Sequence, residues 1–510
     1  MNRKLVFTII LFIILALVLY FLRPWFHSTA MFFYTNPVIL QAIVVTLLIH
    51  FLVLKRIPAL KKSVEFSDVE GGSSETIHIS TLSILTPLIL IFLLIVGSIF
   101  AGWFRNIHIT EQVEYVSRQD LPESSNNLRL MPYSVARRYA KDSLQLSQFK
   151  LGTENIALID ENMSWTFPLT PDGTVIQFTK KNKGITYIDA TEQDRNTKNF
   201  FKDMEIGEGM YITDNLFWNI FKHRYFVDVD DPYYLIDEKN EDILTALGAT
   251  SYDFNFRYGV AYTVPKFEGV FLTDTSGDLE LLSPEEAQEH SVLGENRVFP
   301  ENLAREYTNA YQYHLGVLNK LFIHEDQIKI QDVRDFAEGS RVNRQPYLMD
   351  TEEGLKWFIS AEPHGDSHGI FKIFVIDALS GDFEIFELEG DDILTGPAKA
   401  VDYVRRSNPI VDWNRFDSVE PLPFVREQNL FWKLTVIPSD SAGIAYQAFV
   451  DASTNEVYEL SEEDEIKKFL DGDIDLEEID PTTDPTSDEV LNEIRKKFTE
   501  LEELFEQIDL

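Results

Sequence analysis

Four side chains in the segment EPHGDSHG carry the types of ligand atom that zinc and similar ions accept: Glu362, His364, Asp366 and His368. They alternate along the chain, so a loop or strand would gather them on one face. Such a site would support metal-dependent hydrolysis, and His364, Asp366 and His368 are its candidate ligands. Loops of this composition are also common as solvated turns, and the sequence leaves both interpretations open. It assigns no catalytic residue and no cofactor.

A second cluster of oxygen ligands lies in DVDDPYY, where Asp228, Asp230 and Asp231 stand close together. The spacing is similar to the start of a calcium loop, but the glycine and the late glutamate of an EF-hand are missing. Common enzyme signatures are also missing from the sequence. There is no GxxxxGK[ST] loop, no GxSxG turn and no HExxH pair, since His324-Glu325 lacks the second histidine. The sequence therefore contains none of these standard enzyme signatures.

The segments around these clusters repeat. One sequence pattern occurs four times: a glycine, an apolar run, an aspartate, a turn and a second apolar run. This pattern predicts a β-hairpin. The copies begin at Gly184, Gly269, Gly369 and Gly443. Their turn aspartates are Asp189, Asp274, Asp377 and Asp451. We expect each aspartate to accept N–H groups of its own turn, and we expect Gly277 and Gly381 to adopt positive φ there.

Helical periodicity precedes three of the hairpins, from residues 134, 301 and 397, and Pro397 suits the first position of a helix. A tryptophan followed by a proline also precedes three of them. These tryptophans are Trp165, Trp357 and Trp432. In the remaining copy Tyr262 and Pro265 stand in the same order. A large aromatic side chain on an inner strand fills a core, so each copy is predicted to be a helix-plus-sheet module.

The order helix, tryptophan-bearing strand, apolar strand, Asp-Ala, turn and return strand resembles the PepSY domain. Matching residues are Trp357, Asp377, Ala378, Ser380 and Gly381, then Trp432, Asp451, Ala452 and Thr454. The last copy has Asn455 in place of the turn glycine, and in the first copy Asp189-Ala190-Thr191 runs into Glu192. The resemblance implies tandem modules that restrain peptidases or bind envelope components, with no catalytic residues.

Three apolar runs at 5–22, 38–54 and 81–103 have no charged residue and approach the length that crosses a bilayer. Basic residues flank them at Arg3, Lys4 and in the loop 55–62, so the positive-inside rule places these flanks in the cytoplasm. The expected location is therefore a cell membrane, with three spans in contact with lipid and everything after Trp103 outside the cytoplasm. Gln41 and His50 lie inside the second run. Polar residues in such a position are either functional groups or structural contacts between helices, and the sequence leaves both roles open.

The predicted organisation is a transmembrane anchor (1–104), a linker (105–133), a first α+β module (134–250), a second (251–345), paired third and fourth hairpin modules (346–460), an acidic linker (461–487) and a terminal helix (488–510). Apolar residues of that helix, which runs from Asp488 to Leu510, repeat every three or four positions. We expect it either to mediate self-association or to dock on its own module.

The net charge of −38 is concentrated after the anchor, which itself carries seven basic and four acidic residues. Nucleic acid is therefore excluded as a partner, whereas cations and basic proteins fit. With no cysteine in the chain, disulfides and thiolate sites are ruled out as well. The predicted fold class is α+β, and the predicted function is a membrane-anchored extracytoplasmic binding or scaffold protein with an envelope protein partner. The alternative is an extracytoplasmic metal-dependent hydrolase.

Overall fold

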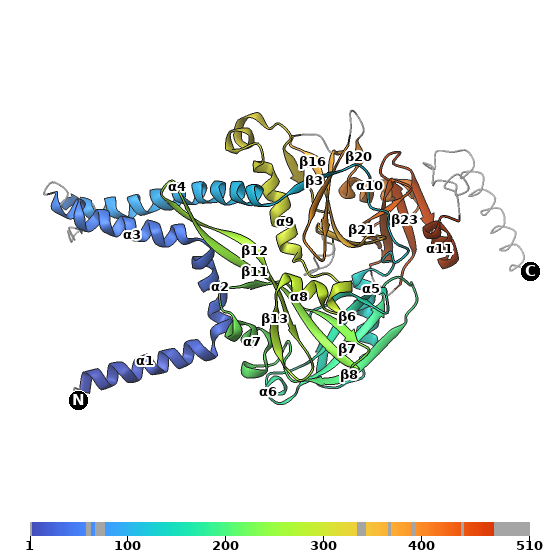
Figure 1. Ribbon diagram of the computed structural model, residues 1–510, viewed down its shortest axis with the longest axis horizontal. Helices are drawn as coiled ribbons and strands as arrows, with labels where there is room; N and C mark the ends of the chain where they lie inside the picture. Colours follow the sequence, from blue (N-terminus) through green and yellow to red (C-terminus); the bar gives the residue numbers. More distant parts are fainter. Residues whose placement is uncertain are drawn as a thin grey trace, which may run out of the picture.

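The computed structural model describes residues 3–57, 63–66, 77–333, 343–365, 369–388, 393–439 and 443–473. Long apolar helices project from one side of a β-rich region (Figure 1). The β-rich region consists of several mainly antiparallel sheets with helices packed on them. The mixed α+β class predicted from the sequence is confirmed at this level.

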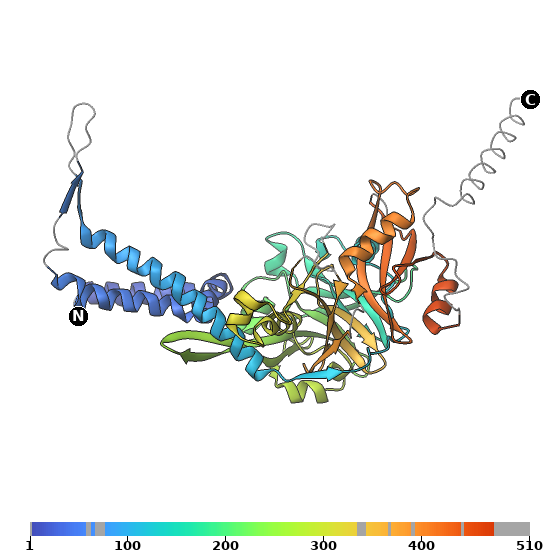
Figure 2. The same cartoon turned by 90° about the horizontal axis from the view of Figure 1, so that it is seen from above.

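The projecting part contains α1 (Arg3–Phe21), α2 (Arg23–Thr35), α3 (Pro37–Leu52), β1 (Ser63–Phe66), β2 (Ile77–Ser80) and α4 (Thr81–Gln112). Within the described residues, α3 with its following turn and α4 are long and apolar enough to cross a membrane. A third crossing requires α1 and α2 to act as one span, although they meet at 90°. In both views α1, α3 and α4 point away from the β-rich region, and α2 runs across them in Figure 1 (Figures 1 and 2).

Four units follow, each built around one sheet and numbered in chain order. The first has α5 (Tyr133–Ser143), β4 (Phe149–Leu151), β5 (Asn155–Ile159), β6 (Asn162–Pro171), α6 (Ile176–Thr179), β7 (Asn182–Asp189) and β8 (Thr197–Met204). The second has α7 (Leu216–His223), β9 (Asp228–Val229), β10 (Tyr233–Asp237), β11 (Asp242–Arg257), β12 (Val260–Thr273), β13 (Leu279–Leu282) and α8 (Pro284–Glu289).

The third unit has α9 (Glu301–Ala310), β14 (Ile328–Ile330), β15 (Tyr347–Thr351), β16 (Gly354–Pro363), β18 (Lys372–Asp377) and β19 (Phe383–Glu387). Its sheet also takes β3 (Tyr115–Arg118), which follows α4 and pairs with β19 in parallel. The fourth has α10 (Pro397–Ser407), β21 (Phe416–Arg426), β22 (Asn429–Pro438), β23 (Tyr446–Asp451), β24 (Val457–Leu460) and α11 (Glu463–Asp471). The pair β17 (Gly369–Ile370) and β20 (Leu394–Thr395) joins these two units.

The tryptophans predicted as core residues are buried and hold equivalent positions in the first, third and fourth units. Each indole N–H donates to the carbonyl oxygen two residues before the helix of its unit. The bonds are Trp165 to Met131 (2.9 Å), Trp357 to Phe299 (3.1 Å) and Trp432 to Thr395 (2.7 Å). Because one side chain thus fixes both a strand and the entry to a helix, the repeat in sequence is a repeat in structure.

The turn aspartates also behave as the sequence predicts. Asp377 accepts N–H groups from Leu379 and Ser380, and Asp451 accepts those of Ser453 and Thr454. Gly277 and Gly381 both have φ of +83°, and Asn455, which replaces the glycine, has φ of +69°. Asparagine tolerates this left-handed conformation better than most residues, which explains why the exchange is accepted.

The second unit departs from the prediction, because Tyr262 lies on β12, the strand that leads into Asp274, and not on the strand before it. Its equivalence to the tryptophans is therefore wrong. The first and second units nevertheless share one backbone feature. Gly184 and Gly269 have φ of +103° and +132° next to register shifts, and a Cβ at either would lie about 2 Å from a backbone oxygen of the neighbouring strand.

Several parts of the predicted organisation do not match the elements of the structure. The boundary at 104 lies within α4, which continues to Gln112 because Arg105 pairs with Glu306 and Ile109 packs into the β-rich region. The boundary at 250 lies within β11. The predicted acidic linker begins with a helix instead, since Ile466, Phe469 and Leu470 of α11 are buried against the fourth sheet. The terminal helix predicted for 488–510 lies outside the described residues.

Candidate functional site

The predicted metal cluster is only partly described. Glu362 is buried at the end of β16, whereas His364 is exposed just after it, and Asp366 and His368 lie outside the described residues. Among the described residues, no group of three or more His, Asp or Glu side chains is placed to hold a metal ion. The assignment of His364, Asp366 and His368 as metal ligands remains a prediction.

His364 stacks on His324, the histidine of the incomplete HExxH segment, with ring centroids 4.2 Å apart and planes 9° from parallel. The backbone N–H of His364 donates to Gln327 (2.8 Å), so the two segments are joined by the β14–β16 pairing. Desolvation, the neighbouring His324, and Lys320 and Lys329 lower the pKa of His364. The neutral form of the His364 ring is therefore favoured.

The three aspartates of DVDDPYY diverge and do not form a calcium loop. Asp228 accepts a hydrogen bond from the hydroxyl of Tyr252 (2.6 Å), whereas Asp230 accepts one from Asn302 (2.8 Å). Asp231 is exposed, and its backbone oxygen accepts from Asn155 (3.3 Å). Asp230 and Asp231 instead contribute to a cavity that the sequence does not reveal.

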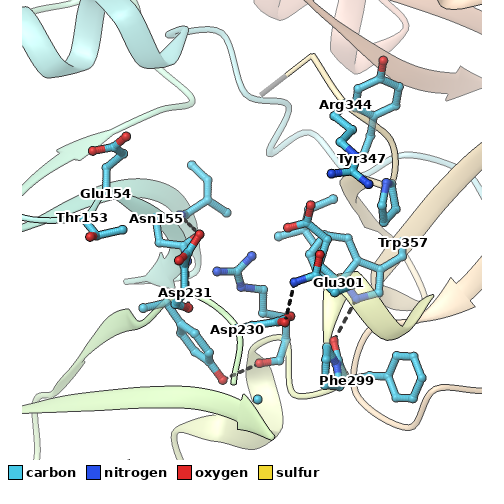
Figure 3. Close-up of a pocket in the computed structure, with 18 of the residues that line it drawn as sticks. Thr153, Glu154, Asn155, Asp230, Asp231, Phe299, Glu301, Arg344, Tyr347 and Trp357 are labelled. Atoms are coloured by element: carbon cyan, nitrogen blue, oxygen red, sulfur yellow. Dashed lines mark hydrogen bonds between the residues drawn. The ribbon is translucent and has the colours of Figure 1, made fainter. Parts of the chain in front are cut away.

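This cavity, of about 330 Å³, lies where the first, second and third units meet (Figure 3). Figure 3 shows Asn155 and Asp231 on one side, Arg344 and Trp357 on the other, and Glu301 between them. The lining consists of Arg129, Tyr133, Thr153, Glu154, Asn155, Ile156, Trp165, Asp230, Asp231, Tyr233, Gly248, Arg297, Val298, Phe299, Pro300, Glu301, Asn302, Arg344, Pro346, Tyr347, Leu348 and Trp357. It is a polar cavity with aromatic walls.

Equivalent positions of the first and third units face each other across it. In both units the sequence Arg-x-x-Pro leads into the helix, at 129–132 before α5 and at 297–300 before α9. The arginine of each motif lies over the tryptophan of its own unit: Arg129 over Trp165 (5.1 Å) and Arg297 over Trp357 (5.7 Å). The strands beside the tryptophans contribute Ile156 and Leu348, which are also equivalent. The cavity thus arises from the repeat itself.

Carboxylates from neighbouring units lie at the N-termini of both helices. Asp230 of the second unit accepts backbone N–H groups of Glu301 and Asn302 at the start of α9. Glu420 of the fourth unit accepts the N–H of Tyr133 at the start of α5 (2.5 Å). Each helix begins after a proline and has no capping side chain of its own, so an acidic residue from elsewhere satisfies its free N–H groups.

Two carboxyl groups in the cavity hold protons more tightly than usual. Burial raises the pKa of Glu301 to about 7, with Asp230 and Asp231 adding to the effect and Arg297 and Arg344 opposing it. Burial also raises the pKa of Asp230, although Asn302 and Arg297 oppose the shift. Part of the Glu301 surface is open to the cavity, while protein atoms surround the group closely. A further cation that entered the cavity would add to the attraction of these arginines and favour the ionised forms of the two carboxyl groups.

Two of the three arginines that line the cavity already have partners. The Arg129 guanidinium lies 3.3 Å from Glu420, and Arg297 lies over Tyr233 (4.9 Å) as well as over Trp357. The hydroxyl of Tyr233 donates to the backbone oxygen of Arg297 (2.5 Å). The cavity can therefore receive a positively charged group at Glu301, Asp230 and Asp231, with aromatic walls for its aliphatic stem.

Sequence reasoning missed this site because its residues are scattered over 230 positions of the chain. The one local signal was the Arg-x-x-Pro motif, which occurs ahead of both helices and was not recognised as part of the repeat.

The chain matches no family model and has no significant match among curated proteins. Among solved structures, a glycoside hydrolase family 43 β-1,3-galactosidase with galactodeoxynojirimycin is 12% identical, over 64% of this chain and 80% of that one. Its TM-score of 0.17 is too low to support any argument about fold or activity.

Proposed function

We propose that the chain is a membrane-anchored extracytoplasmic binding protein whose cavity receives a basic side chain of an envelope protein partner. The observation that carries this proposal is the grouping of Glu301, Asp230 and Asp231 in one cavity, where burial raises the pKa of the first two. A lysine or arginine side chain adds a positive charge beside these carboxyl groups and favours their ionised forms. The strongly acidic region around the cavity attracts basic partners.

Membrane anchoring is supported by the apolar α3 and α4, with α1 as a further element. Three helices in this proposal contact lipid. The basic flanks at Arg3, Lys4 and 55–62 lie in the cytoplasm by the positive-inside rule, so the β-rich region faces outward. The resemblance to PepSY domains makes a peptidase or an assembly factor the class of partner to seek. Self-association through residues 488–510 remains a separate expectation.

The orientation is tested by adding protease to intact spheroplasts that hold the full chain. We expect cleavage within the β-rich region, at exposed loops such as the one near Arg195, and no cleavage in the loop around Lys61. Permeabilised cells serve as the control, in which both regions become accessible. Protection of the β-rich region in intact cells would contradict the orientation and the extracytoplasmic role.

The ligand site is tested by photo-crosslinking in intact cells from a benzophenone residue at Thr153, on the cavity wall, with the exposed Lys198 as reference position. We expect capture of a protein from position 153 alone, through a peptide that carries a lysine or arginine at the crosslink. Capture should strengthen as the pH rises from 6 to 8, because Glu301 then loses its proton and attracts the cation.

Glu301→Gln keeps the shape of the side chain and removes its charge, so it is expected to abolish both the capture and its pH dependence. The matched control is Glu280→Gln, which removes an exposed carboxylate on β13. Equal capture from the wild type and from Glu301→Gln would show that the cavity is not the binding site.

A further inference from the structure

The hairpin formed by β11 and β12 is far longer than its own sheet requires. The two strands pair continuously from Thr245 and Thr273 to Arg257 and Val260, whereas β10 and β13 pair only with the half nearest the sheet. The distal half leaves the β-rich region and lies alongside α3 and α4 in both views (Figures 1 and 2). A register shift between Ala249 and Thr250 separates the two halves, and such bulges bend a strand.

Polar groups of the first helices are paired with the hairpin backbone. The side chain of Gln41 donates to the oxygen of Gly259 (2.5 Å) and accepts from the N–H of Ala261 (2.9 Å). Thr263 donates to the oxygen of Thr35 (2.7 Å), and the hydroxyl of Tyr34 donates to the oxygen of Tyr252 (3.2 Å). Gln41 lies in the first turns of α3, about 6 Å along the axis from Pro37.

These contacts decide between the two roles that the sequence leaves open for Gln41. The side-chain amide of Gln41 pairs with one backbone N–H and one backbone oxygen of the hairpin, within the apolar part of α3. Gln41 is therefore a structural contact. Unpaired backbone groups are costly in lipid, and irregular backbone at that depth needs protein partners. His50 has a similar role, since its ring nitrogen lies 2.9 Å from the hydroxyl of Thr86 on α4.

The other face of the hairpin tip carries aromatic rings that are mostly exposed. Phe254 and Phe256 are each 64% exposed, and Tyr258 is 85% exposed. In water such a patch would be costly, but phenylalanine and tyrosine are favourable at the boundary between headgroups and acyl chains. The charged neighbour Arg257 turns back along α4, with its guanidinium over Phe104 (5.9 Å) and 3.4 Å from Glu111.

We infer that the tip of the β11–β12 hairpin, residues 254–260, is inserted into the outer leaflet of the bilayer that holds α3 and α4. The occupant of the aromatic face is lipid, because the ring of Tyr258 lies beside Phe104 of α4 (centroids 5.8 Å apart), and Phe104 lies beside Phe100 on the exposed apolar surface of that helix. The hairpin is an additional contact with the membrane. It enters the bilayer only as far as the boundary between headgroups and acyl chains. This inference rests on the proposed membrane anchor.

The test uses the full chain in lipid nanodiscs of phosphatidylcholine and phosphatidylglycerol. Because the chain has no cysteine, a single Tyr258→Cys variant can carry an environment-sensitive fluorophore at one position. We expect a blue-shifted emission, strong loss of fluorescence with lipids spin-labelled near the headgroup, and little loss with aqueous iodide.

Two reference variants make each outcome decisive. Ile95→Cys reports the exposed surface of α4 (57%), and Val175→Cys reports an exposed apolar residue just before α6, in the first unit (72%). Lipid quenching at 95 without quenching at 258 would overturn the inference and leave the anchor intact. Absence of lipid quenching at both positions would overturn the anchor as well, whereas lipid quenching at Val175 would show that the probe itself drives insertion.

The role of Gln41 is tested separately by hydrogen exchange. Gln41→Leu removes both bonds to the tip, so the amide of Ala261 is expected to lose protection. Thr46→Val changes another buried polar residue of α3 and is expected to leave Ala261 protected. Equal protection of Ala261 in the wild type and in Gln41→Leu would show that Gln41 does not hold the hairpin.

Discussion

Replacement of Trp432 by alanine is expected to lower the free energy of unfolding of the β-rich region by about 3–5 kcal/mol. The side chain is fully buried, and its ring lies 6.0 Å from those of Tyr347 and Phe358 in the third unit. It therefore fills the core shared by the third and fourth sheets, and it also fixes the entry to α10 through its bond to Thr395. Pulse proteolysis in urea, on the full chain in detergent, measures the change.

A companion variant separates packing from hydrogen bonding. Trp432→Phe keeps most of the ring but removes the indole N–H, so we expect a smaller loss, with the bond to Thr395 contributing about 0.5–1.5 kcal/mol. The control is Trp413→Ala, because Trp413 is only partly buried. If Trp432→Ala unfolds at the same urea concentration as the wild type, the equivalence of the units does not reflect a shared core.

The second large effect is expected from Lys433, which is completely buried on β22. Its amine donates to the backbone oxygen of Arg129 (2.7 Å) and contacts the hydroxyl of Thr435 (2.7 Å). Burial lowers the pKa of Lys433 to about 7, with Glu420 opposing the shift and Arg129 adding to it. The lysine therefore holds the segment before α5 against the fourth sheet largely as a neutral amine at alkaline pH.

The pH dependence of stability follows from this shift. An unfolded lysine titrates near 10.4, so between pH 7 and that value the unfolded chain binds one proton more than the folded chain. The free energy of unfolding is therefore expected to rise with pH, by at most about 1.4 kcal/mol per unit and by about 2.5 kcal/mol between pH 7.5 and 9.5. Buried tyrosines such as Tyr233 have raised pKa values, so they oppose the trend as the pH approaches 10, where tyrosines of the unfolded chain begin to ionise.

Lys433→Met is the informative comparison, because it fills the same space with an apolar chain that does not titrate. We expect its stability to be nearly constant between pH 7.5 and 9.5, as measured by the same proteolysis assay. Glu301 titrates around 7 and adds little within this window, so Glu301→Gln should retain the wild-type slope. An equal slope in Lys433→Met and in the wild type would contradict the assignment.

The repeat was accessible from the sequence because it rests on local spacing. A tryptophan, an Asp-Ala pair and a turn residue recur at nearly constant distances, and each distance corresponds to one hairpin. The correspondence fails in the second unit. Tyr262 follows the order expected for the tryptophans, but it lies on β12, the strand that leads into the turn aspartate, and not on the strand before it. Spacing alone cannot distinguish two adjacent strands of a hairpin when both are apolar.

The cavity depends on how units pack, and no local pattern encodes that. Asp230 and Glu301 are 71 residues apart, and their pKa values are raised by an enclosure that only the assembled units create. α11 was missed for a related reason. Its acidic composition suggested a linker, and its three apolar residues are decisive only because the fourth sheet offers them a surface.

The short connection between α4 and β3 has a mechanical consequence. Only two residues separate Gln112 from Tyr115, and β3 then pairs in parallel with β19 at the edge of the sheet that carries Trp357. A pull along α4 loads the β3–β19 hydrogen bonds in shear, so they resist together and do not open one at a time. Tension on the helix is thereby passed into the sheet that forms one wall of the cavity.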